Sequence, residues 1–109
     1  MPEEAERLAI WRRSLPAEAP VAADVDLPFL ARKFKLAGGH IRNVAVTGAF
    51  LAAARGDPIG MRHLVLATRR EYQKLGKLVA EADFEQYFGM LKGAPAAPAR
   101  AAEVATSVA

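Results

Sequence analysis

Residues 38–55 read GGHIRNVAVTGAFLAAAR, a glycine pair followed by a long apolar run that ends in arginine. The run contains no proline and no acidic residue, and its apolar residues recur at helical spacing. One stripe consists of Ile41, Val44, Ala45, Gly48 and Ala52. Other apolar residues occupy most of the remaining circumference. The pattern therefore predicts a helix over about residues 40–55 that lies in the middle of a helical bundle.

Gly38 and Gly39 precede this helix and are predicted to end the helix before it and to start this one. Glycine tolerates the positive φ at which helices stop, and it lets another backbone or a ligand approach closely. Upstream, Leu8, Trp11 and Leu15 predict a first helix over about residues 3–15, with Trp11 in the core. Residues 16–25 carry two prolines and are predicted to form a connector.

Three further helices complete the predicted bundle. The second begins at the N-cap Asp26, has Pro28 in its first turn and runs to about Leu36. The fourth covers about residues 60–80, after Gly56 closes the third helix. Its predicted buried side consists of Met61, Leu64, Val65, Thr68, Tyr72 and Leu75. Its predicted solvated arc consists of Arg62, Arg69, Arg70, Lys74 and Lys77. A short fifth helix is predicted to be capped by Asp83 and to pack through Phe84, Tyr87, Phe88 and Leu91.

The fold class that follows is all-α, a small bundle of four or five helices. With 109 residues the chain suffices for one domain, which we assign to residues 1–92. Residues 93–109 are mostly alanine with two prolines, and we expect a disordered tail there.

Composition narrows the cellular setting and the chemistry. The net charge is +3, and the chain has no cysteine, no secretory leader pattern and no stretch near the roughly 20 apolar residues that cross a bilayer. We therefore expect a soluble, cytoplasmic protein without membrane contact. His40 and His63 lack metal-ligand spacing, and neither Ser14 nor Ser107 has a histidine partner nearby, so we expect no metal site and no nucleophilic triad. No phosphate-binding glycine loop is present, so the chain alone is not expected to be a catalyst.

Two segments, ERLAIWRRSLP (residues 6–16) and the stretch from Asp24 to Lys77, together resemble the C-terminal helical lid of AAA-type (AAA+) ATPases. The resemblance rests on four successive patterns, R..IW...LP, D.D...LA, G..I.N....A...A and I...H...A..RE..K, with Gly48 in place of the first alanine of the third pattern. It covers about residues 6–78. Within that group, the chain is most similar to ATPases encoded with bacterial contractile injection systems.

The resemblance implies a function and a site. In AAA-type ATPases the lid folds over ATP or ADP, which is held by an α/β domain that also binds Mg²⁺ and carries the Walker motifs. The start of the third helix is the family's sensor-2 region, so the implied nucleotide-facing residues are Gly38, Gly39, His40, Ile41 and Arg42. The implied partners are that α/β domain, neighbouring subunits of a homo-oligomeric ring and a protein substrate that ATP hydrolysis remodels. The residues 1–109 contain no α/β domain of this kind.

Alternatives remain for these residues and for the function. The glycine pair could be a plain turn, His40 a partly exposed residue of the first turn, and Arg42 with Asn43 a solvated pair. The chain could instead be a stand-alone helical adaptor that binds proteins. A DNA-binding helix-turn-helix module is the least favoured function, because the third helix is too apolar to lie across a phosphate backbone.

Overall fold

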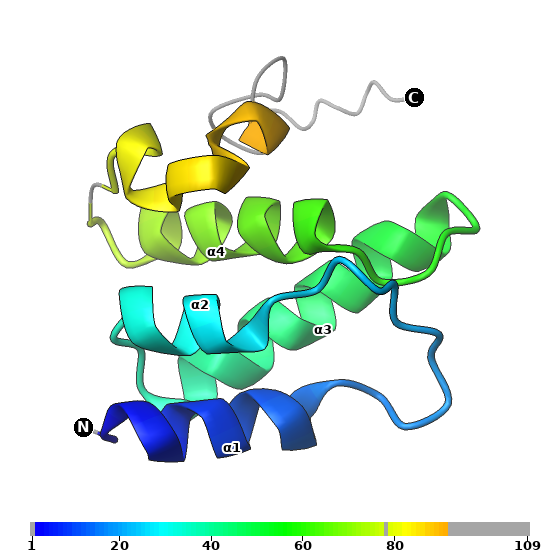
Figure 1. Cartoon of the computed structure of the whole chain (residues 1–109), viewed down its shortest axis with the longest axis horizontal. Coiled ribbons are helices and arrows are strands. Elements are labelled where there is room, and N and C mark those ends of the chain that lie inside the picture. Colours follow the sequence, from blue (N-terminus) through cyan, green and yellow to red (C-terminus); the bar gives the residue numbers. More distant parts are fainter. Residues whose placement is uncertain (1, 78, 92–109) are drawn as a thin grey trace.

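The computed structural model describes residues 2–77 and 79–91. This part of the chain forms α1 (Glu4–Ser14), α2 (Leu27–Lys33), α3 (Gly38–Ala54), α4 (Met61–Lys74) and the 3-10 helix η1 (Glu81–Leu91). The layers run from α1 through α2 and α3 to α4 and η1 (Figure 1). Outside the helices, an isolated parallel bridge joins Val21 to Ile59. The predicted all-α bundle is confirmed, and the predicted tail at 93–109 lies outside the described residues.

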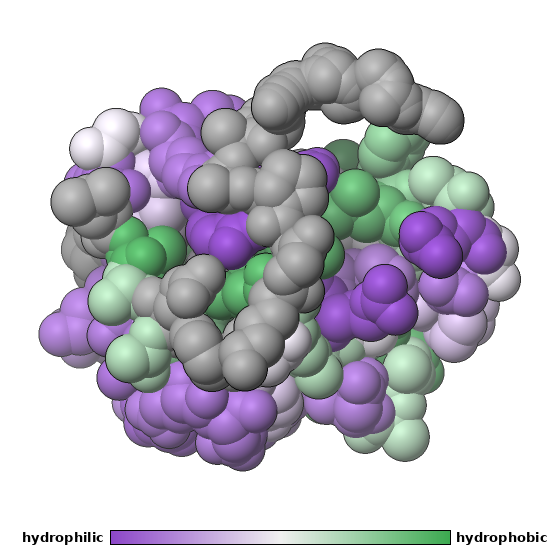
Figure 2. Space-filling model, turned by 90° about the horizontal axis from the view of Figure 1, so that it is seen from above, coloured by the Kyte–Doolittle hydropathy of each residue, from purple (hydrophilic) through white to green (hydrophobic). Residues whose placement is uncertain are grey.

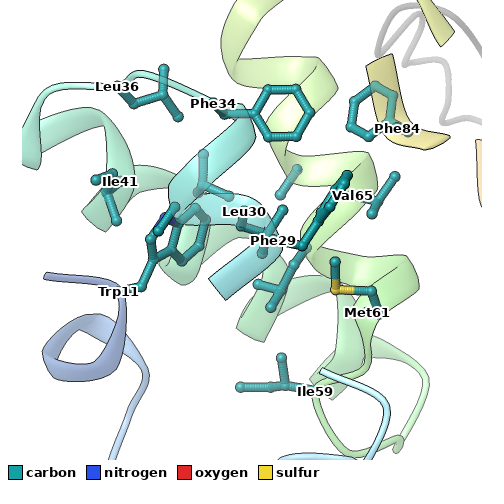
Figure 3. Packing of buried hydrophobic residues seen from close by; sticks show 14 of the residues in the cluster. Trp11, Phe29, Leu30, Phe34, Leu36, Ile41, Ile59, Met61, Val65 and Phe84 are labelled. Atoms are coloured by element: carbon teal, nitrogen blue, oxygen red, sulfur yellow. The ribbon is translucent and has the colours of Figure 1, made fainter. Parts of the chain in front are cut away.

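A core of aromatic and aliphatic side chains joins the layers. Trp11 of α1 is fully buried, as its spacing predicts, and it lies near Leu30 and Ile41 (Figure 3). On the other side of α2, Phe34 packs against Phe84 of η1, with ring centroids 5.0 Å apart. One continuous cluster of buried residues therefore connects α1 to η1.

The ends of α2 and α4 differ from their predicted positions. α2 ends at Lys33, because Phe34 leaves the helical conformation (φ −112°, ψ 110°) and the amide of Leu36 donates to the carbonyl of Phe34 in a tight turn. Phe34 and Leu36 are buried, and Lys35 between them stays exposed. α4 ends at Lys74 because Gly76 adopts a φ of +71°. The amide of Gly76 donates to the carbonyl of Gln73, which closes the last turn.

The predicted buried stripe of α3 is confirmed, since Ile41, Val44, Ala45, Gly48 and Ala52 are its buried residues. α3 lies between α1 and α4, as predicted for the middle of the bundle, but it is not buried on all sides. Val46 and Phe50 are 63% and 71% exposed. α3 packs against α1 and α4, and an apolar side of it stays open because the short α2 and η1 pack elsewhere on the bundle.

Two smaller predictions also fail. Arg69, predicted on the solvated arc of α4, is buried, with 7% of its surface exposed. The fifth helix consists of two 3-10 segments separated by a kink at Glu85, where φ is 51°. It begins at Glu81, so Asp83 lies inside it, and Oδ2 of Asp83 accepts the amide of Ala80 instead of capping a later start. Phe84 and Leu91 are buried as predicted. The predicted packing of Phe88 falls on a side chain outside the described part.

The described surface is mixed. Seen from the side of η1, hydrophilic residues dominate, and hydrophobic residues appear in patches between them (Figure 2). Among residues 2–77 and 79–91, none of the helices combines the length and the apolar character needed to cross a membrane.

Gly48 provides a test of the packing between α3 and α4. A Cβ added at Gly48 would lie 2.7 Å from Cδ2 of the fully buried Leu64, so in Gly48→Ala the Leu64 side chain or the helices themselves must shift. We expect a loss of about 1–3 kcal/mol in the free energy of unfolding, measured in urea. Gly39→Ala is the control within the same helix, because the nearest atom, Nη2 of Arg42, is 4.0 Å from the added Cβ. It should be neutral or stabilising by up to about 1 kcal/mol, and equal losses in the two variants would contradict this packing.

Candidate functional site

The start of α3 is built on Ala37, whose carbonyl accepts the amides of His40 and Ile41 at 3.0 Å each. Gly38 and Gly39 are the first two residues of the helix, and no side chain caps it. The pair starts α3 as predicted, but the prediction that it ends the preceding helix through positive φ is wrong, because α2 already ends at Lys33. Among the described glycines, only Gly56 and Gly76 have positive φ. Gly38 is half-buried beside Ile10, whereas Gly39 is exposed.

The side chain of Arg42 folds back over the glycine pair. A Cβ added at Gly38 would lie 3.8 Å from Nη1 of Arg42, and one added at Gly39 would lie 4.0 Å from Nη2. The guanidinium therefore stands beside the first turn of α3, where the amide groups of a helix start point outward. Positive charge and the positive end of the helix dipole lie together at this surface.

His40 points toward α4 and pairs with Glu71. Its Nδ1 lies 2.7 Å from Oε2 of Glu71, and the same oxygen accepts the side-chain amide of Asn43 at 3.3 Å. Lys74 lies 3.2 Å from the other oxygen, Oε1. Only 4% of the Glu71 side chain is exposed, against 38% for His40 and 67% for Lys74. The carboxylate is thus the centre of a polar cluster, His40–Asn43–Glu71–Lys74, that joins the start of α3 to the end of α4.

The charge of Glu71 follows from these contacts. Burial acts to raise the pKa of Glu71, but the hydrogen bonds from His40, Asn43 and Lys74 outweigh it and hold the pKa below its ordinary value of 4.5. The carboxylate is therefore ionised at neutral pH. An ionised carboxylate only accepts hydrogen bonds, so Nδ1 of His40 carries the proton of this bond.

The five predicted site residues thus separate into three groups. Gly38, Gly39 and Arg42 lie together on the outer side of the α3 start. His40 is turned toward α4 by Glu71. The side chain of Ile41 is fully buried in the core, where it anchors the first turn and offers no surface to a ligand.

Glu71 was not singled out as a site residue from the sequence. The available signal was a lone acidic residue within the otherwise basic segment TRREYQK of residues 68–74, three residues before Lys74. Its partners on α3 lie 31 and 28 residues away in sequence, so only the packing of α3 on α4 reveals them.

The described residues contain no cluster of three or more histidine, aspartate or glutamate side chains placed to hold a metal ion. His63, for example, accepts the amide of Gly60 through Nδ1 at 2.9 Å, and its Nε2 lies 4.0 Å from Asp57. Burial and the neighbouring Arg62 lower the pKa of His63 and favour its neutral form. The neutral His63 side chain therefore acts as a hydrogen-bond acceptor at the start of α4.

Comparisons of the chain with models of protein families and with curated proteins found no match.

Proposed function

We propose that this chain is the lid portion of an AAA-type ATPase. In this proposal the start of α3 covers ATP or ADP held, together with Mg²⁺, by a separate α/β domain. Hydrolysis there would change the lid angle and so remodel a protein substrate, in a homo-oligomeric ring in the cytoplasm. The observation that carries the proposal is the open surface at Gly39, with the guanidinium of Arg42 beside it.

The chemistry of this surface suits a nucleotide phosphate. Outward-pointing amides and the helix dipole favour negative charge at a helix start. The Arg42 guanidinium adds a donor group that can bind two phosphate oxygens at once. Because Gly39 has no side chain, a ligand bound to another domain can reach the backbone of α3.

The first turn of α3 is connected to the rest of the bundle, so a movement at this turn can be transmitted to the other helices. Ile41 fixes the first turn in the core, and the His40–Glu71 contact ties it to α4. A ligand that pulls on the α3 start therefore moves α3 and α4 as one unit. Different contacts with ATP and ADP would then favour different lid angles.

Gly39→Trp tests the proposal in the complete ATPase. The indole would occupy the surface that the nucleotide must approach, so we expect ATP affinity to fall about tenfold or more and hydrolysis to fall with it. Gly39→Ala is the matched control and should behave as the unsubstituted protein, because a Cβ meets only the Arg42 side chain at 4.0 Å. Unchanged ATP affinity and hydrolysis in Gly39→Trp would refute the proposal. Thermal unfolding of residues 1–109 with each substitution checks that the fold is retained.

A second candidate function, a stand-alone adaptor that binds proteins, is favoured by the exposed Val46 and Phe50 on α3. The structure weakens the case for DNA binding, because Arg69 is buried and cannot contact a phosphate from the basic arc of α4. A titration with duplex DNA that showed salt-dependent binding at low micromolar concentration would favour that function over both others.

A further inference from the structure

Val46 and Phe50 form an exposed apolar pair on α3. Their exposed fractions are 63% and 71%, and Val21, at 45%, is the other large hydrophobic residue exposed in the described part. Residues four apart in a helix lie on the same side, one turn from each other. Ala53, which is also exposed, continues this side toward the end of α3. An apolar strip thus occupies the second half of the helix surface.

The first half of the same side is polar and positive. Gly39, Arg42 and Asn43 lie there and are exposed, and α3 contains no acidic residue. Among residues 2–77 and 79–91, no ion pair involves Arg42. The adjacent acid, Glu71, is 4% exposed and already bound by His40 and Lys74. No exposed acidic group in this cluster offsets the charge of Arg42.

We propose that this side, the α3 outer face (Gly39, Arg42, Asn43, Val46, Phe50 and Ala53), binds a helix of a partner protein. The partner helix would carry apolar side chains one turn apart, to cover Val46 and Phe50, and acidic side chains at the end that lies against Arg42. Gly39 and Ala53 have little or no side chain, so they let the second helix approach along the whole face. The inference goes beyond the proposed lid function: it requires no nucleotide, and it assigns Gly39 and Arg42, which the lid proposal places beside the nucleotide, to a partner helix instead.

A partner helix fits this face better than a second copy of the same chain. Two copies of the α3 outer face would leave Arg42 without an acidic partner, because the face has no acidic residue. Arg42 would then be paired with another Arg42 or with an apolar strip. An acidic partner helix satisfies both halves of the face, and charge complementarity also fixes its orientation.

The test uses residues 1–109 and a fluorescein-labelled synthetic helix of about 18 residues with leucines at helical spacing and glutamates at both ends. Fluorescence anisotropy should show saturable binding, and a matched peptide with lysines in place of the glutamates should bind at least about tenfold more weakly. Phe50→Ala should weaken binding of the glutamate peptide about tenfold or more. Val21→Ala, which truncates the exposed hydrophobic residue outside α3, should leave binding unchanged.

A charge swap adds a result that loss of fold cannot imitate. Arg42→Glu should weaken binding of the glutamate peptide and strengthen binding of the lysine peptide. Arg62→Glu, at an exposed position on α4, should change the binding of neither peptide. Equal binding of both peptides, no binding, or no effect of Phe50→Ala would overturn the proposal. A dimer in sedimentation equilibrium that Phe50→Ala dissociates would overturn it in favour of a second copy. Phe50-dependent binding to vesicles of anionic phospholipid would overturn it in favour of a membrane surface.

Discussion

Phe34→Ala is expected to lower the free energy of unfolding by about 3–5 kcal/mol. The phenyl ring is 2% exposed and contacts three other rings. It meets Phe29 and Tyr72 edge to face, with centroids 6.1 Å and 5.8 Å away, and lies 5.0 Å from Phe84. Truncation removes these contacts and leaves a cavity between α2, α4 and η1. Because the surrounding side chains belong to one continuous buried cluster, the cavity cannot close completely.

Phe50→Ala is the matched control, since it removes the same atoms from an exposed site. Phe50 is 71% exposed, so its truncation should change stability by no more than about 0.5 kcal/mol. Urea unfolding followed by circular dichroism measures both variants. Similar losses at the two positions would mean either that Phe50 is covered in solution or that Phe34 is not in the core.

Glu71→Gln is expected to lower the free energy of unfolding at pH 7 by about 1.5–3 kcal/mol, because charged hydrogen bonds are replaced by neutral ones in a buried place. The carboxylate holds His40, Asn43 and Lys74 at 2.7–3.3 Å. Glutamine presents one oxygen where the carboxylate presents two, so one of these partners must lose its acceptor.

Glu85→Gln is the control for this substitution. Glu85 also pairs with a lysine, Lys33 at 3.2 Å, but its side chain is 42% exposed. An exposed pair contributes between zero and about 1 kcal/mol, so Glu85→Gln should have the smaller effect. If the two variants lose the same free energy of unfolding, burial does not strengthen the contacts of the Glu71 carboxylate, contrary to our inference.

The pH dependence of stability separates Glu71 from other titrating groups. The pKa of Glu71 is lower in the folded protein than its ordinary value of 4.5, so its stabilisation is complete above pH 4.5 and is lost as the pH falls through the folded pKa. His63 acts at higher pH. Its lowered folded pKa means that the unfolded chain takes up the proton first as the pH falls below 6.5. The unsubstituted protein and the Glu71→Gln variant should therefore both lose stability as the pH falls below 6.5. Below pH 4.5, the unsubstituted protein should also lose the stabilisation by Glu71, and the Glu71→Gln variant should show no such loss.

The sequence pattern predicted the elements that are long and strongly periodic. The buried stripe of α3 and the core position of Trp11 follow from helical spacing alone. The early end of α2 was not predicted, because the alternation of buried and exposed residues over Phe34, Lys35 and Leu36 is too short to distinguish from one helical turn. The end of α4 was readable in principle from Gly76, since glycine with positive φ commonly ends a helix.

The candidate site was only partly predictable. The glycine pair and Arg42 were identified from the resemblance, and the structure brings them together. Glu71 and the buried Arg69 depend on how α4 packs, which local periodicity does not report. The exposure of Val46 and Phe50 has the same origin. An apolar helix predicts burial, but which side remains open depends on how many elements the chain has to cover it.

Photolabelling tests the nucleotide-facing assignment of the α3 start. Any Walker-bearing domain encoded upstream of the chain or beside it is combined with the chain and labelled with azido-ATP, and the labelled residues are mapped by mass spectrometry. The proposal predicts label within Gly38–Arg42, and less label there after Gly39→Trp. Label confined to other residues, or the absence of any Walker-bearing domain encoded with this chain, would contradict it.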